Sequence, residues 1–116
     1  MSFKPALVAL ASMLVAQPVT AQQRQQNVQI LAQAYDRCMA TYAVRLTKTP
    51  ATDEEIYSQA TALCASLDSQ LKAALNAQLE PAQAAEILRS IDEQAKPNFM
   101  ATLAQSRSDR ARRGGG

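Results

Sequence analysis

The chain has 116 residues, twelve basic and ten acidic side chains, a formal net charge of +2 at pH 7, and no histidine. Because histidine is missing, Ser–His and Cys–His nucleophile pairs and the common zinc sites are excluded. All three glycines stand at the C-terminus, so hairpin turns upstream lack their usual residue, and the alternating pattern of strands is missing as well. These features predict an all-α fold.

The first 21 residues have the organisation of a cleaved secretory signal peptide. Lys4 precedes an apolar run over residues 6–16, and Val19 and Ala21 place small residues where signal peptidase requires them. We therefore expect cleavage between Ala21 and Gln22 and delivery to the periplasm or the medium. The alternative is an uncleaved membrane anchor, although a run of 11 residues is far shorter than the ~20 that cross a bilayer as a helix.

The first helix is predicted over residues 25–46. Its apolar residues recur at steps of three and four, which is typical of one helical face. They are Leu31, Ala34, Tyr35, Cys38, Tyr42 and Leu46. A Thr-Pro pair at 49–50 ends the helix, because proline has no amide hydrogen and restricts the residue before it. Tyr35, Met39 and Tyr42 have two interpretations, packing in a core or lining an apolar ligand pocket.

The second helix is predicted to begin at Thr52 and to continue to Leu75. Thr52 and Glu55 have the spacing of a capping box, in which each side chain accepts from the other residue's amide. The apolar face comprises Ile56, Ala60, Leu63, Cys64, Leu67, Leu71, Ala74 and Leu75. The acidic residues 53–55 also admit a cation site as an alternative, but capping and the helix dipole explain the same residues.

Cys38 and Cys64 are the only cysteines, and we expect them to form a disulfide between the two helices of an antiparallel hairpin. An exported chain reaches an oxidising compartment, where such a pair joins. Counted from the connecting loop, the two positions differ in height by only ~4 to 5 Å. In a cytosolic protein they would instead be free core thiols.

The third helix is predicted to begin with Pro81 in its first turn. Its apolar face comprises Ile87, Leu88, Ile91, Ala95, Phe99 and Leu103. Since the face stays in phase beyond Pro97, one helix kinked at Pro97 and two helices meeting there are both open. The expected architecture is a small bundle of three to four helices.

Residues 79–83, Leu-Glu-Pro-Ala-Gln, followed by an amphipathic helix with a basic end, resemble the LTxxQ element of periplasmic stress-type helical proteins. The resemblance covers about residues 79–105. Glu80 replaces the threonine, and no second copy of the element is present. The resemblance implies a helical cradle that acts on unfolded client proteins or on sensor domains.

The last ten residues differ in composition from the domain over residues 22–106, whose acidic side chains outnumber its basic ones. The basic residues are Arg107, Arg110, Arg112 and Arg113. With three glycines behind them, they predict a disordered tail over residues 107–116. The tail has two interpretations, contact with an anionic surface or a solvated terminus. No aromatic residues are interleaved, so no specific nucleic-acid partner is expected.

No redox C-x-x-C motif, Gly-rich phosphate loop or dinucleotide fingerprint is present in the sequence. We therefore expect a non-enzymatic exported helical protein, without cofactor or metal, that works as a protein-interaction or chaperone and adaptor-like module. Its partner would be another protein or an unfolded client. The alternative is a binder of a small ligand or of the anionic envelope surface, through the interhelical cleft or the basic tail.

Overall fold

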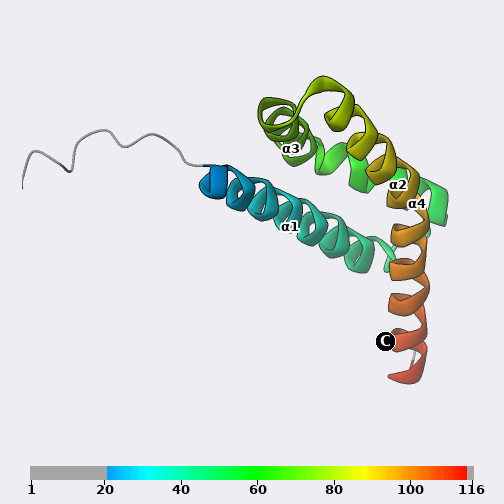
Figure 1. The fold of residues 1–116 in the computed structure, drawn as a ribbon. Coiled ribbons are helices and arrows are strands. Elements are labelled where there is room, and N and C mark those ends of the chain that lie inside the picture. Colours follow the sequence, from blue (N-terminus) through cyan, green and yellow to red (C-terminus); the bar gives the residue numbers. More distant parts are fainter. Residues whose placement is uncertain (1–20, 115–116) are drawn as a thin grey trace, which may run out of the picture.

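The computed structural model describes the backbone of residues 21–114 and the side chains from residue 27 onward. This part forms four α-helices and no strand: α1 (Ala21–Leu46), α2 (Asp53–Leu63), α3 (Ala65–Gln78) and α4 (Pro81–Arg112) (Figure 1). The all-α prediction is confirmed. The signal peptide predicted for residues 1–21 lies outside the described residues except for Ala21. The proposed cleavage pair, Ala21 and Gln22, stands in the first turn of α1, which begins four residues earlier than predicted.

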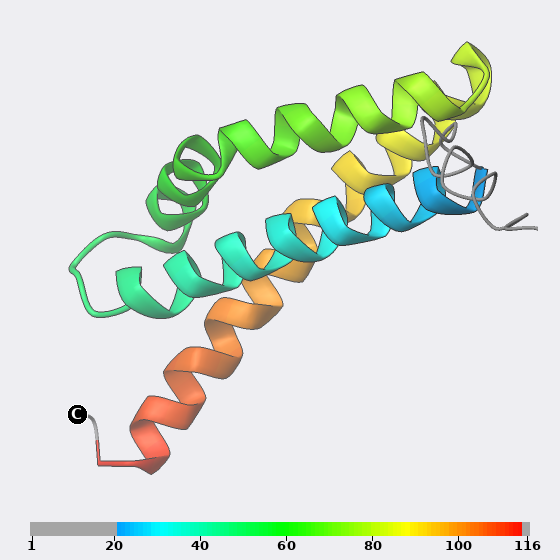
Figure 2. The same ribbon diagram turned by 90° about the vertical axis from the view of Figure 1, so that its left-hand side faces the viewer.

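α1 is the central helix, because it contacts each of the other three. Figure 2 shows α3 running back along α1 in the antiparallel direction, while α4 crosses the pair and continues downward. α1 is therefore covered by the α2–α3 arm on one side and by α4 on another.

The helix predicted from Thr52 to Leu75 is divided in two at Cys64, which corrects the sequence-based expectation. Cys64 has φ −102° and ψ 13°, outside helical values. Its amide still donates to the Ala60 carbonyl at 2.9 Å, and its carbonyl accepts from the Asp68 amide at 3.2 Å. The chain thus changes direction without losing these bonds. The bend allows α2 to pack against α4 while α3 runs along α1 (Figure 2).

The predicted disulfide is present between α1 and this bend. The Cα atoms of Cys38 and Cys64 are 6.0 Å apart, within the range that a disulfide requires. Cys64 is buried and belongs to the core, whereas Cys38 packs against the edge of the core. The covalent link therefore fixes the central helix to the α2–α3 arm at the point where the arm bends.

The core is small and draws on α1, α2 and α4 together with Cys64. Its members are Met39, Ala43, Ile56, Ala60, Cys64, Phe99 and Leu103. On α1 the buried residues Met39 and Ala43 each stand one position after a residue of the predicted face, Cys38 and Tyr42. The predicted face is itself half-buried against the core. The displacement arises because α1 is covered on two sides, so the buried sector is wider than one stripe. Two predicted core positions are wrong: Leu63 is 56% exposed and Ile87 is 40% exposed.

α4 is one helix that passes through Pro97, which settles the alternative left open by the sequence. Pro81 occupies the first turn, as predicted. Pro97 cannot donate to the Glu93 carbonyl, but both residues are exposed, so water can reach the carbonyl. The prediction of disorder from residue 107 is wrong for residues 107–112, because α4 continues to Arg112.

The capping box at the start of α2 is confirmed in both directions. The Thr52 hydroxyl accepts from the Glu55 amide at 3.2 Å, and the Glu55 carboxylate accepts from the Thr52 amide at 2.8 Å. The bond from the Thr52 amide, followed by the bond with the Thr52 side chain, lowers the pKa of Glu55. The charged carboxylate is therefore the form that stabilises the start of α2.

We expect Thr52→Ala to lower the free energy of unfolding by about 1 kcal/mol, because the Glu55 amide loses its acceptor. A pH effect follows from Glu55. Since its folded pKa is depressed, its contribution is full above the ordinary glutamate pKa of 4.5 and disappears as the pH falls through the lower, folded value. Urea unfolding between neutral and strongly acidic pH measures both effects. Glu55→Gln should lose stability at neutral pH and show a smaller further loss in acid. An equal acid-induced loss in Glu55→Gln and the unchanged protein would contradict this role of Glu55.

Candidate functional site

A groove of about 490 Å³ lies between α1 and the middle of α4, with one leucine of α3 also lining it. Its apolar lining includes Tyr35, Met39, Leu71, Ile91, Ala95 and Phe99. Polar side chains also line it, namely Asp36, Gln94, Asn98 and Thr102. The groove is therefore a mainly apolar surface bordered by groups that form hydrogen bonds.

Alanines account for the open space between the two helices. Ala32 and Ala40 line the groove from α1, and Ala95 lines it from α4. A methyl group is too short to fill the gap between crossing helices, whereas the larger Met39 and Phe99 meet in the core beside it. The groove thus begins where the packed core ends.

Tyr35 lies in the groove wall within an acidic surrounding. Burial is the main reason that its pKa is raised, and the negative charges of Asp68, Asp36 and Asp92 add to the effect. The Tyr35 hydroxyl therefore stays protonated at neutral pH and can donate a hydrogen bond. Asp68 pairs with Lys72 at 3.0 Å, but no ion pair in the described part of the chain includes Asp36 or Asp92. The groove consequently has an excess of negative charge near Tyr35.

The structure separates the three α1 residues that the sequence grouped as core or pocket. Tyr35 lines the groove, and Met39 belongs to both the groove wall and the core. Tyr42 is not part of the groove; it packs against the core, and the Arg45 guanidinium lies 5.7 Å from its ring centre. The aromatic face thus contributes Tyr42 to core packing, Tyr35 to the groove and Met39 to both.

The acidic first turn of α2 is used for capping and for ion pairs with α4. Glu55 caps the helix, as described above. Asp53 pairs with Arg107 and Glu54 with Lys96, each at 2.6 Å. No group of three side chains able to hold a metal ion was found among the described residues. Every acid of this turn therefore has a structural partner within the described part of the chain.

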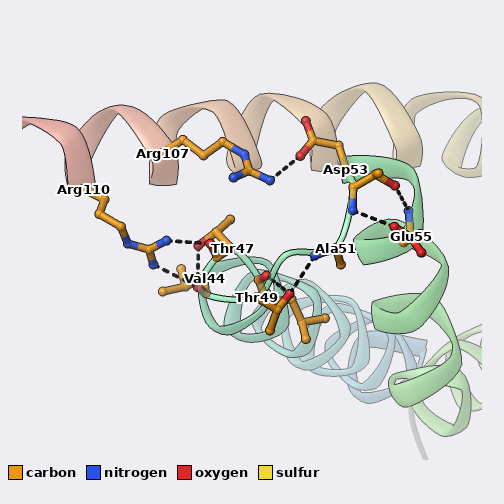
Figure 3. A network of polar contacts seen from close by, with 10 residues as sticks. Val44, Thr47, Thr49, Ala51, Asp53, Glu55, Arg107 and Arg110 are labelled. Atoms are coloured by element: carbon orange, nitrogen blue, oxygen red, sulfur yellow. Dashed lines mark hydrogen bonds and ion pairs between the residues drawn. The ribbon is translucent and has the colours of Figure 1, made fainter. Parts of the chain in front are cut away.

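Two arginines of the predicted tail are built into the fold (Figure 3). Arg107 reaches Asp53, and Arg110 donates to the carbonyls of Thr47 at 2.8 Å and Val44 at 3.4 Å. These carbonyls belong to the end of α1, where the helix dipole is negative and a cation is favourable. The two arginines give residues 107–112 distant partners, which explains why this segment is helical.

The last two arginines, Arg112 and Arg113, interact with a nearby acid of α4. Arg112 forms an ion pair with Asp109, one turn earlier on α4. Arg113 is exposed at the end of the helix, and its charge contributes to lowering the pKa of Asp109. Of the four arginines proposed to contact an anionic surface, Arg107 and Arg110 are thus engaged within the molecule.

The sequence pattern indicates the α1 side of the groove but not its α4 side. The pattern predicts Ile91 and Ala95 on a core face, but they line the groove from the opposite helix. The alanines at the crossing are the signal that could have indicated the α4 side, because they leave room that larger residues would fill.

None of the four described helices combines the length and the apolar character that a membrane span requires.

No family model, curated protein or solved structure matches the chain. The functional argument therefore rests on the geometry and charge of the groove and of the helix surfaces.

Proposed function

We propose that this chain is a non-enzymatic protein-interaction module, of the adaptor or chaperone type, that works in the periplasm or outside the cell. Its binding site is the groove between α1 and α4. The observation that carries the proposal is the apolar lining of this groove, in which Tyr35 and Ile91 are half-buried and available to an incoming chain. A short amphipathic helix that lays one apolar face into such a groove is a common mode of peptide recognition.

The charge at the groove selects the kind of segment that it takes. Asp36 lines the groove, and Asp92 follows Ile91 on α4, close enough to act on Tyr35. Negative charge beside an apolar surface favours a partner that combines apolar and basic side chains. We therefore propose that the bound segment is apolar on one face and basic beside it.

The disulfide supports the proposed location. Disulfides persist in oxidising compartments and are rare in the cytosol, where thiols are kept reduced. The link between Cys38 and Cys64 is therefore suited to the compartment that an N-terminal signal peptide would reach.

The test uses two fluorescent amphipathic peptides, one with leucine and lysine and one with leucine and glutamate at the same positions. We expect the lysine peptide to bind and Ile91→Gln to weaken its binding roughly tenfold, since an apolar contact is lost. Ile87→Gln is the matched control, because Ile87 is an exposed isoleucine one turn earlier on α4 and outside the groove. Fluorescence anisotropy measures each dissociation constant.

Three outcomes separate the candidates. Equal loss of binding in Ile87→Gln and Ile91→Gln would contradict the groove as the site. Tighter binding of the glutamate peptide would contradict the charge argument. A small ligand remains the second candidate, because about 490 Å³ lies within the usual range of ligand pockets. It would be favoured if neither peptide bound while a small apolar dye bound in a manner sensitive to Ile91→Gln.

A further inference from the structure

We propose that the outward side of α1 is a second binding surface, and that it binds the anionic headgroup layer of a phospholipid membrane. We call this surface the basic face. Its charged members are Arg37, Arg45 and Lys48, and its exposed aliphatic members are Ile30 and Val44. It borders the groove at Ala40, which lines both, and its binding does not require the function proposed for the groove.

The basic face lies opposite the buried line of α1. Starting from Arg37, Val44 and Arg45 follow after seven and eight residues, which returns each to the same side of the helix. Lys48 lies in the turn that follows Leu46, two residues beyond the end of α1. The buried residues Met39, Ala43 and Thr47 occupy the other side. The basic face is therefore turned away from α2, from α3 and from the part of α4 that packs in the core.

Exposed aliphatic side chains accompany the positive charges. Ile30 lies seven residues, or about two helical turns, before Arg37 and is 60% exposed, and Val44 is 46% exposed. They are two of the four large hydrophobic side chains exposed in the described part of the chain. A shallow hollow lined by Ala40, Thr41 and Val44 lies between Arg37 and Arg45. A surface that combines cations with exposed aliphatics is typical of helices that lie in a membrane interface.

No carboxylate lies on the basic face. The chain has no acidic residue between Asp36 and Asp53, and Asp36 belongs to the groove, at another angle around α1. No ion pair among the described residues includes Arg37, Arg45 or Lys48. The three cations are therefore available to an anionic partner.

The end of α4 adds positive charge beside this face. Arg110 donates to the carbonyls of Val44 and Thr47, so the last turn of α4 lies next to the last turn of α1 (Figure 3). Arg112 and Arg113 follow directly. The single acid nearby on α4, Asp109, already pairs with Arg112. Two segments far apart in the sequence thus contribute to one positive end of the molecule.

The shape of the basic face favours a membrane over other anionic partners. Ile30 and Arg45 are about 22 Å apart along a straight helix at 1.5 Å per residue. A ridge of this length fits a plane, into which guanidinium groups donate to phosphates while the aliphatics enter the acyl boundary. Single-stranded nucleic acid binds largely by stacking on aromatic rings, and the basic face carries none.

The experiment is flotation of the full chain with vesicles of phosphatidylglycerol and phosphatidylcholine, compared with vesicles of phosphatidylcholine alone. We expect stronger binding to the anionic vesicles and a loss between about 50 mM and 300 mM salt, because surface charges are screened. The triple variant Arg37→Gln, Arg45→Gln, Lys48→Gln should bind the anionic vesicles on the order of 100-fold more weakly, about fivefold for each charge. Since the apolar run at residues 6–16 is common to all variants, the difference between variants reports on the basic face.

The matched control removes the same net charge elsewhere, with Lys72→Gln, Arg89→Gln and Lys96→Gln, all exposed to a similar degree. It should retain most of the anionic binding that exceeds the binding to phosphatidylcholine. An equal loss in both triple variants would show that only net charge matters and would overturn the proposal. Tight binding of a DNA oligonucleotide without binding to anionic vesicles would assign the face to a dissolved polyanion instead. Circular dichroism of each variant verifies the fold, and Ile30→Ser with Val44→Ser should weaken vesicle binding without changing its dependence on salt.

Discussion

Replacing both cysteines with alanine should lower the free energy of unfolding by about 3.5 kcal/mol. The disulfide closes a loop between positions 26 residues apart, and opening it restores conformational freedom to the unfolded chain. In a domain of this size, such a loss corresponds to a fall in melting temperature on the order of 15 to 25 °C. The effect is large because the core comprises only a few side chains, among which Cys64 is itself buried.

Calorimetry and urea unfolding, with and without a phosphine reductant, measure this effect. The unchanged protein should lose stability when it is reduced, whereas the Cys38→Ala, Cys64→Ala variant should not respond to the reductant. A melting temperature that is the same in the oxidised and reduced protein would show that the link contributes nothing to stability.

Leu103→Ala should have the second large effect, a loss of about 2 to 5 kcal/mol in the free energy of unfolding. Leu103 has no exposed surface and is among the largest fully buried side chains of the described residues. It packs in the core with Phe99 of the same helix and with residues of α1 and α2. Its truncation leaves a cavity at the place where α4 is held to the rest of the molecule.

Leu63→Ala is the matched control, because it removes the same atoms from a leucine that is 56% exposed. The sequence pattern assigns both leucines to the core, but the structure buries only Leu103. We expect Leu63→Ala to change the stability by at most about 0.5 kcal/mol. Similar losses in the two variants, measured by urea unfolding, would contradict the arrangement of α2 against α4.

Features that depend on neighbouring residues could be predicted from the sequence. The capping box of Thr52 and Glu55 involves residues three apart, and the proline-linked start of α4 involves only its first turn. The disulfide could be predicted because only two cysteines are present and the hairpin brings them to similar heights. In each case the deciding interaction joins residues that are close in the sequence, or only one pairing of residues is possible.

The bend at Cys64 left no signal in the sequence. No glycine or proline occurs between Pro50 and Pro81, and the apolar spacing continues through the bend. The direction of α3 is set by its packing along α1, a contact between distant segments. The displaced core line on α1 has a similar origin, since alanines such as Ala43 fit a surface or a core equally well.

The sequence predicts one part of the groove and one part of the tail, but not the rest of either. Tyr35 and Met39 could be identified from the face of α1, but the opposite wall around Ile91 depends on where α4 crosses. The helical state of residues 107–112 depends on bonds from Arg107 and Arg110 to partners 54 to 66 positions earlier. Composition alone cannot show that such distant acceptors will be in reach.

The central position of α1 also determines when the chain can fold. A chain leaves a ribosome or a translocation pore with its N-terminus first, so α1 emerges before every helix that covers it. The α2–α3 arm follows, but Phe99 and Leu103, which complete the core around Met39, arrive only with the second half of α4. Until then the core lacks the side chains that α4 contributes. In the exported protein that we propose, the core would therefore be completed only after most of α4 has crossed the membrane.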